Sequence, residues 1–143
     1  MLESIFSACS ALALLGWASL IFLPRQRTAH LIASVAIPLA IAVVYLVLIA
    51  QHFGRSEGSF GSLSGVAQLF SHPALLLAGW VHYLAFDLFI GAWETRDAKH
   101  HGIPHLLVVP CLLLTFMLGP IGLLSYWGLR TWHTGSVRLT SAH

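Results

Sequence analysis

Four long runs of apolar residues divide this chain, and they restrict the folds that it can adopt. The runs extend over residues 5–23, 29–50, 73–93 and 103–127. A helix needs about 20 apolar residues to cross the hydrocarbon core of a bilayer, and only helices and closed barrels satisfy their backbone groups there. We therefore predict an all-α integral membrane protein in which the 143 residues form one domain of four transmembrane helices.

The segments outside these runs have the composition of loops. Residues 51–72 are dominated by Gly and Ser, and residues 131–143 form a polar tail. Pro38 in the second run, and Pro110 and Pro120 in the fourth, are predicted to kink their helices. Charged residues make up only 8% of the chain, and the net charge of +2 comes without a Lys/Arg cluster, which excludes a nucleic-acid-binding class.

The third apolar run is unusual because it contains ionisable side chains. It carries His82, Asp87 and Glu94, and three of the five carboxylates of the chain fall between positions 87 and 97. A charged group in hydrocarbon is costly, so such residues usually have a partner or a function. A functional site is therefore expected in this region, whose further polar residues are Arg96, Asp97, Lys99, His100, His101 and His105.

Helical spacing divides these groups into two sets. Asp87 and Glu94 share one stripe but lie two turns apart, roughly 10 Å along the axis, which is too far for both to hold one ion. Glu94, Asp97 and His101 follow at spacings of three and four residues, and His105 could join them at the membrane boundary. Carboxylates and imidazoles bind zinc or iron. We therefore consider a metal site formed by Glu94, Asp97, His101 and His105, although the spacing matches no strong signature.

Acid–base chemistry without a metal is an alternative use of the same residues. Asp87, deep in an apolar helix, would favour its protonated form and could act as a general acid. His82 lies five residues earlier and faces a different groove, unless a neighbouring helix brings the two groups together. A purely structural alternative is a solvated helix end from Glu94 to Lys99 with balanced charges, in which Asp87 and His82 form interhelical hydrogen bonds.

An aromatic stripe accompanies the carboxylates on the third run. Its members are Trp80, Tyr83, Phe86, Phe89 and Trp93. Such a stripe more often packs against other helices than binds a ligand. Beside a buried carboxylate it would also suit a long apolar polyene, and the predicted substrate contacts are Trp80, Tyr83, Phe86 and Trp93.

Several motifs occur in a fixed order over the second half of the chain. They are W-x-H-Y-x-x-x-D-L-x-x-G-x-W at 80–93, R-D at 96–97, G-I-P-H at 102–105, P-C-L at 110–112, Thr115 and G-P-x-G-L-L at 119–124. In this order they resemble the ABA4-like family of small membrane proteins, named for the plant abscisic-acid-deficient 4 protein. The resemblance covers nearly the whole chain, but the first two runs match only in hydropathy.

The resemblance implies a four-helix membrane protein linked to carotenoid metabolism, which in plants is the formation of neoxanthin from violaxanthin. In that isomerisation an epoxide opens while a neighbouring carbon loses a proton to give an allene, so no redox cofactor is required. The reaction needs an acid beside the epoxide oxygen and a base at the carbon. The candidates on or beside the motif positions are Asp87, Glu94, His82, Asp97 and His105.

We therefore predict a membrane-embedded, isomerase-like enzyme that acts on a carotenoid or related isoprenoid lipid. A non-catalytic carotenoid- or lipid-binding protein and a metal-dependent membrane enzyme are the alternatives. The early start of the first run, without a basic leader, favours a bacterial-type member in the inner membrane. Four cations against three favour both short loops in the cytoplasm and both termini outside. A homodimer could complete the site, because four helices enclose little volume.

Overall fold

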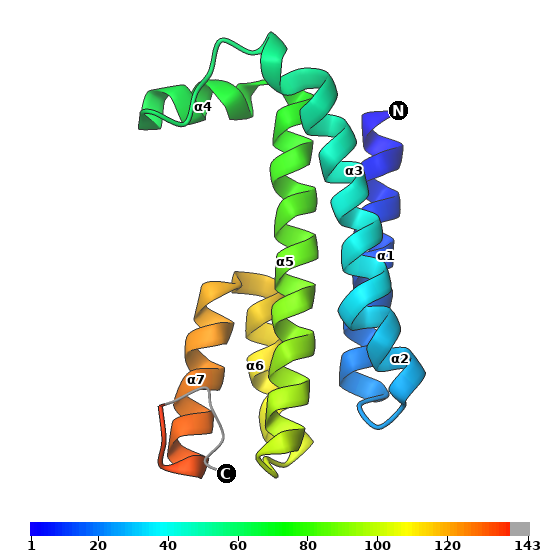
Figure 1. Cartoon of the computed structure of the whole chain (residues 1–143), viewed down its shortest axis with the longest axis vertical. Helices are drawn as coiled ribbons and strands as arrows, with labels where there is room; N and C mark the ends of the chain where they lie inside the picture. The colour runs from blue at the N-terminus through cyan, green and yellow to red at the C-terminus, as the bar shows by residue number, and fades with distance from the viewer. Residues whose placement is uncertain (138–143) are drawn as a thin grey trace.

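The computed structural model of the chain describes residues 1–137, apart from the side chain of Arg55, and all regular secondary structure in this part is helical, with no strand. A long helix α1 is followed by α2, which runs through a π-helical segment η1 into α3; a short turn η2 and the helix α4 then lead into α5, α6 and α7 (Figure 1). Their bounds are α1 Leu2–Phe22, α2 Arg27–Leu31, η1 Ile32–Ala36, α3 Ile37–His52, η2 Phe53–Arg55, α4 Leu63–Ser71, α5 Pro73–His100, α6 His105–Leu118 and α7 Pro120–Thr134.

Three helical stretches of the described chain are long and apolar enough to cross a membrane. They are Leu2–Phe22, Arg27–His52 and Pro73–His100, with 21, 26 and 28 residues. Figure 1 shows α5 at the centre, with α1 and α3 on one side and α6 and α7 on the other. Helices of this length and composition identify an integral membrane protein.

The structure replaces the predicted fourth transmembrane helix over 103–127 by a hairpin. The helices α6 and α7 have only 14 and 15 residues and pack against each other. At 1.5 Å per residue, α6 is about 21 Å long, which is shorter than the roughly 30 Å hydrocarbon core. Gly119, with a φ of +40°, forms the turn, and Pro120 begins α7. The chain therefore turns back halfway along α5, and α7 ends at the opposite end of the molecule from the start of α1 (Figure 1).

Prolines act differently at the three predicted kinks. Pro120 starts a helix, where its missing N–H is not needed, instead of bending one. Pro38 directly follows the π-helical segment Ile32–Ala36, and Pro110 lies inside α6; the helix continues past both. The kinks at Pro38 and Pro110 stay predictions.

Other boundaries agree with the sequence. α5 begins at Pro73 and continues to His100, and Gly102, with a φ of +69°, follows it, as the Gly102 and Pro104 stop signal predicts. The loop 51–72 contains α4, whose first turn is capped by the Ser62 hydroxyl, which accepts a 3.0 Å hydrogen bond from the backbone N–H of Gly65. The helical part of the predicted tail 131–143 ends at Thr134, and residues 138–143 lie outside the described residues.

Glycines let α1 approach α5 closely. A Cβ at Gly91 would meet the ring of Trp17 at 2.5 Å, and a Cβ at Gly16 would meet Leu88 at 2.6 Å. Small residues at helix contacts are the usual means of packing within a membrane, where the hydrophobic effect does not drive helices together. The close contact fixes α5 as the helix against which the rest of the protein packs.

Candidate functional site

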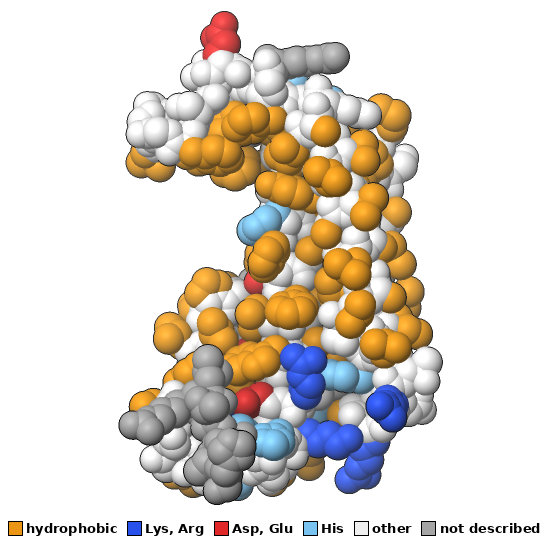
Figure 2. All heavy atoms as spheres, in the orientation of Figure 1, with side chains coloured by type: hydrophobic (Ala, Val, Ile, Leu, Met, Phe, Trp, Pro, Cys, Tyr) orange, Lys and Arg blue, Asp and Glu red, His pale blue; other side chains and the backbone are white. Residues whose placement is uncertain are grey.

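The short hairpin leaves a notch in the side of the molecule. Figure 2 shows this hollow between α4 at one end and α6 and α7 at the other, with α5 along its inner side and mostly hydrophobic side chains around it. Phe86 of α5 is 59% exposed. α5 is long and apolar enough to cross a membrane, so a notch halfway along it is expected to open toward the lipid.

Asp87 lies at the middle of α5, where the hairpin turns. A Cβ at Gly119 would lie 3.0 and 3.1 Å from its two carboxyl oxygens, so the absence of a side chain at the turn makes room for this carboxyl. The hydroxyl of Tyr83 lies beside Asp87 and donates a 2.6 Å hydrogen bond to the carbonyl oxygen of Phe116. Oδ2 of Asp87 is buried and has no hydrogen-bond partner among the described residues. Such an orphaned oxygen needs a proton, a ligand or water.

His82 lines an apolar cavity above Asp87. The cavity has a volume of about 260 Å³ and lies between α3, α4 and α5. The imidazole contacts the rings of Tyr45 and Phe86, and it lies close enough to Asp87 for an electrostatic interaction. Although His82 was predicted to face a different groove from Asp87, the two side chains are therefore close enough to interact electrostatically. The other lining residues are Ile49, Phe53, Phe60, Leu69, Phe70, Leu75, Ala78 and Gly79.

Glu94 is completely buried between α5 and the hairpin. Its side chain has 0% exposure, and its two oxygens accept hydrogen bonds from the hydroxyl of Thr115 at 2.9 and 3.1 Å. Gly122 of α7 packs directly on Thr115, which leaves no space for a side chain at that position. Glu94 therefore holds α6 against α5, and it lines none of the described cavities.

Asp97 binds α7 through a polar network. Its Oδ2 accepts hydrogen bonds from the hydroxyl of Tyr126 at 2.6 Å and from Nε of Arg130 at 2.8 Å. His101 lies 3.5 Å from the other carboxyl oxygen, and its Nε2 lies 3.2 Å from Arg130. Arg130 is 1% exposed, so this ion pair is almost free of solvent. The ion pair holds the C-terminal part of α7 against α5.

His105 joins α6 to α1 instead of joining the carboxylates. Its Nε2 lies 2.9 Å from the carbonyl oxygen of Ile21, which can only accept, so this nitrogen carries the proton and donates. Within residues 1–137, no group of three or more His, Cys, Asp or Glu side chains is placed to hold a metal ion. The structure does not bring Glu94, Asp97, His101 and His105 together as one set, because Thr115, Arg130 and Ile21 engage three of them separately; the metal site stays a prediction.

The aromatic stripe divides between packing and the notch. Trp80 donates a 3.2 Å hydrogen bond to Ser10 of α1 and stacks on Phe6. Trp93 packs against Tyr126 and Trp127 of α7. Tyr83 and Phe86 lie next to Asp87 along α5, and they are the members of the stripe that stay close to the notch; the substrate contacts stay predictions.

The two residues that hydrogen-bond to Asp97 were not identified from the sequence. Arg130 and Tyr126, which hold Asp97, belong to α7, and a continuous fourth helix would carry them to the far side of the membrane. The available signal was the Gly119-Pro120 pair in the middle of an apolar run, because Gly-Pro marks turns.

One comparison with known proteins identifies a family for this chain. A family model described as ABA DEFICIENT 4-like matches residues 4–126. No curated protein and no solved structure matches the chain.

Proposed function

We propose, because the chain belongs to the ABA4-like family, that it is a membrane-embedded enzyme that acts on a carotenoid or related isoprenoid lipid. Membership in this family indicates a carotenoid-related membrane protein, and the reaction is our proposal. We propose acid–base isomerisation of the epoxide-to-allene type, in the bacterial inner membrane. The observation that carries the proposal is the buried, unpartnered Oδ2 of Asp87 at the tip of the hairpin.

The surroundings of Asp87 suit a long apolar substrate. The α4 cavity lined by His82 lies toward one end of α5, and the notch continues from it to the hairpin tip. From Pro73 to Asp87 this path along α5 is about 21 Å long, which accommodates much of an extended polyene. A polyene in the notch would place a polar end group against Asp87 while its chain remained in contact with lipid and with Phe86.

The proposed reaction balances without an external oxidant. The carboxyl of Asp87 gives its proton to the epoxide oxygen as the C–O bond opens. His82 takes a proton from the neighbouring carbon, and the electron pair of that C–H bond forms the new double bond of the allene. Return of the proton from His82 to Asp87 completes the cycle, so the product is an isomer of the substrate. Acid and base catalysis by positioned side chains typically contributes about 100- to 10,000-fold each.

The remaining candidates support the site in this proposal. Glu94 through Thr115, and Asp97 through Arg130, hold the hairpin so that Gly119 stays beside Asp87. His105 holds the start of α6 on α1. None of these three residues lines the α4 cavity. They are expected to affect the reaction through the position of the hairpin.

Turnover by the purified protein tests the proposal directly. The protein would be reconstituted in nanodiscs with violaxanthin, and the products separated by chromatography. Asp87→Asn keeps the shape of the side chain but removes the acid, so turnover should fall by about 100-fold or more. Glu57→Gln is the matched control, because Glu57 is an exposed carboxylate outside the membrane-spanning helices. Full turnover by the Asp87→Asn protein would contradict the role of Asp87.

Non-catalytic binding of a carotenoid or lipid is the second candidate function. The exposed apolar side chains around the notch favour it, because they suit a bound polyene whether or not a reaction follows. In that case the purified protein would carry pigment, visible in its absorption spectrum, and would convert none of it. The same spectrum recorded on the Asp87→Asn protein would show whether the carboxyl contributes to binding.

A further inference from the structure

A second cavity lies at the end of the molecule away from α4. It has a volume of about 630 Å³ and lies between the loop that follows α1 and the turn from α5 to α6. An adjoining cavity of about 370 Å³ shares Pro24, Arg25, Gln26, Thr95 and Lys99 with it. We call the two together the basic cavity. Its other lining residues are Phe22, Leu23, Arg27, His30, Arg96, Ala98, Gly102, Ile103, Pro104 and His105.

The cavity concentrates positive charge that has no counterion among the described residues. Arg25, Arg27, Arg96 and Lys99 line it, and none of the four forms an ion pair within residues 1–137. The nearest carboxylate in the sequence, Asp97, is already occupied by Arg130 and Tyr126. Figure 2 shows Lys and Arg side chains gathered at this end of the molecule.

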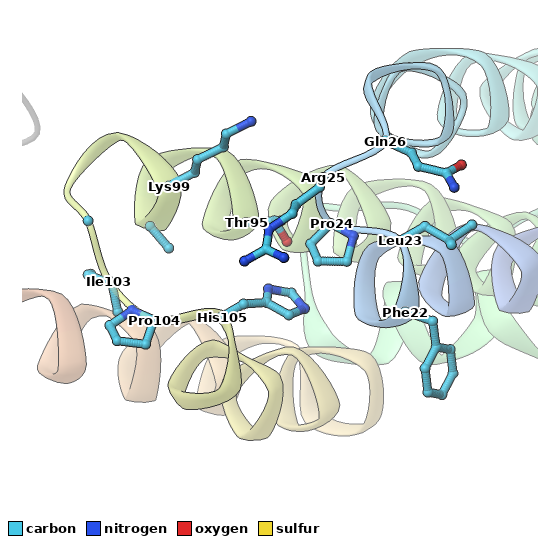
Figure 3. Close-up of a pocket in the computed structure, with 12 residues that line it drawn as sticks. Phe22, Leu23, Pro24, Arg25, Gln26, Thr95, Lys99, Ile103, Pro104 and His105 are labelled. Carbon is cyan, nitrogen blue, oxygen red and sulfur yellow. The ribbon is translucent and has the colours of Figure 1, made fainter.

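The polar groups of the cavity point to an anion. In Figure 3 the guanidinium of Arg25 points into the cavity toward His105 and Thr95, and Lys99 extends from α5 at its edge. His105 is held in place by its hydrogen bond to Ile21. Nε2 of His30, which lines the adjoining part, is buried without a hydrogen-bond partner among the described residues. A buried polar atom without a partner indicates a place for a ligand.

The other wall of the cavity is apolar and faces the membrane. Phe22 and Leu23 end α1, and Phe22 is 77% exposed. Ile103 closes the cavity on the side of α6. Because the loop after α1 connects two membrane-spanning helices, the cavity lies at the level of the lipid headgroups. A ligand there can place an anionic group among the cations and an apolar chain along Phe22.

We propose that the basic cavity binds the phosphate group of an amphiphile with an apolar chain. Phosphate oxygens accept charge-assisted hydrogen bonds from guanidinium and ammonium groups, and Arg25 and Lys99 present both kinds. Basic pockets at a membrane surface bind phosphate-bearing lipid headgroups in this way. This binding site is distinct from Asp87 and does not depend on the proposed isomerisation.

Binding of two lipids that differ only in the phosphate tests the proposal. The full chain would be purified in a neutral detergent and titrated with dioleoyl phosphatidic acid and with dioleoylglycerol, and binding would be followed by native mass spectrometry. Wild-type protein should retain one molecule of phosphatidic acid and no dioleoylglycerol. The double variant Arg25→Gln, Lys99→Gln should bind phosphatidic acid about 25-fold more weakly, at about fivefold for each cation near a headgroup.

Matched variants separate a site from general attraction to cations. Arg55→Gln removes one charge at the other end of the molecule and should leave binding unchanged. Arg25→Lys keeps the charge and should retain most of the binding, which would attribute the loss to the charge at this position. An unfolding midpoint equal to that of the wild type in the double variant would show that its loss of binding is not a folding defect. Equal weakening by Arg55→Gln, or wild-type affinity in the double variant, would overturn the proposal. Inorganic phosphate that displaced phosphatidic acid at equal concentration would overturn the amphiphile as the ligand.

Discussion

The close contact between Gly122 and Thr115 offers a direct test of the packing of α6 against α7. An ideal Cβ at Gly122 would overlap the backbone nitrogen, the Cα and the hydroxyl of Thr115. In Gly122→Ala, α6 and α7 must therefore separate, and the Thr115 hydroxyl must move from the buried carboxyl of Glu94. Gly128→Ala is the matched control, because it is on the same helix and its Cβ would meet no atom within 4 Å.

The expected magnitude follows from three contributions. Overpacking costs about 1–3 kcal/mol. Loss of the hydroxyl donor to a buried carboxyl costs about 1–3 kcal/mol more. Alanine favours the helix over glycine by about 1 kcal/mol, which acts in the opposite direction. We therefore expect Gly122→Ala to lower the free energy of unfolding by about 3 kcal/mol, near the middle of these ranges. Gly128→Ala should raise it by up to about 1 kcal/mol, because only helix propensity changes.

Unfolding in mixed micelles measures both variants. The protein would be titrated with a denaturing detergent, and the tryptophan fluorescence would be followed, because Trp93 stacks on Trp127 across α5 and α7 at 5.8 Å between ring centres. Gly122→Ala should unfold at a lower denaturant fraction than the wild type, and Gly128→Ala at an equal or higher one. A Gly122→Ala protein as stable as the Gly128→Ala protein would show that α6 and α7 do not pack at this point.

Three further predictions concern the polar contacts and the direction of the chain. Arg130→Met leaves the Asp97 carboxylate with only Tyr126 and His101, so the free energy of unfolding should fall by about 3–5 kcal/mol; adding Asp97→Asn should recover part of the loss in a double-mutant cycle, and strictly additive effects would contradict the ion pair. Thr115→Val removes the hydroxyl at Glu94 with little change in shape and should cost about 1–3 kcal/mol in the same titration, whereas an unchanged midpoint would place Glu94 elsewhere. A reporter fused after Thr134 should lie on the same side of the membrane as one inserted in the loop after α1, and on the opposite side from one placed before α1, as measured by reporter activity in cells.

Hydropathy and the local Pro and Gly residues were sufficient to predict the long apolar helices from the sequence. The first three of the four apolar runs form helices long and apolar enough to cross a membrane. α5 begins at Pro73 and ends before Gly102 because these residues favour a helix start and a helix stop. The hairpin was different. Residues 103–127 are apolar on both sides of Gly119, so hydropathy is the same for one long helix and for two short ones. The choice depends on Gly122 packing on Thr115 and on the contacts of α7 with α5, which are tertiary contacts.

The sequence predicted those features of the site that depend on the spacing of residues within one helix. Helix geometry separated Asp87 from Glu94, and the structure places the first at the notch and the second in a closed contact with Thr115. The same geometry could not supply partners from other helices. Asp97 was a candidate metal ligand because Glu94 and His101 share its helix face, and its partner in the structure, Arg130, was expected on the other side of the membrane.

The hairpin also changes the argument about orientation. With a fourth transmembrane helix, Arg130 would lie on the side of Arg55, and the Lys and Arg residues would divide almost equally between the two sides of the membrane.

In the structure, Arg130 hydrogen-bonds to Asp97, so it lies at the end of the molecule that carries the basic cavity. Five cations of the described residues then lie at this end against Arg55 at the other; they are Arg25, Arg27, Arg96, Lys99 and Arg130. Arg138 lies outside the described residues. Because loops rich in Lys and Arg tend to stay in the cytoplasm, this asymmetry predicts that the basic cavity and the end of α7 lie inside and the start of α1 outside. With three candidate membrane-spanning helices and a re-entrant hairpin, we expect the two ends of the described chain on opposite sides of the membrane, instead of both termini outside, and the fused reporters test this expectation.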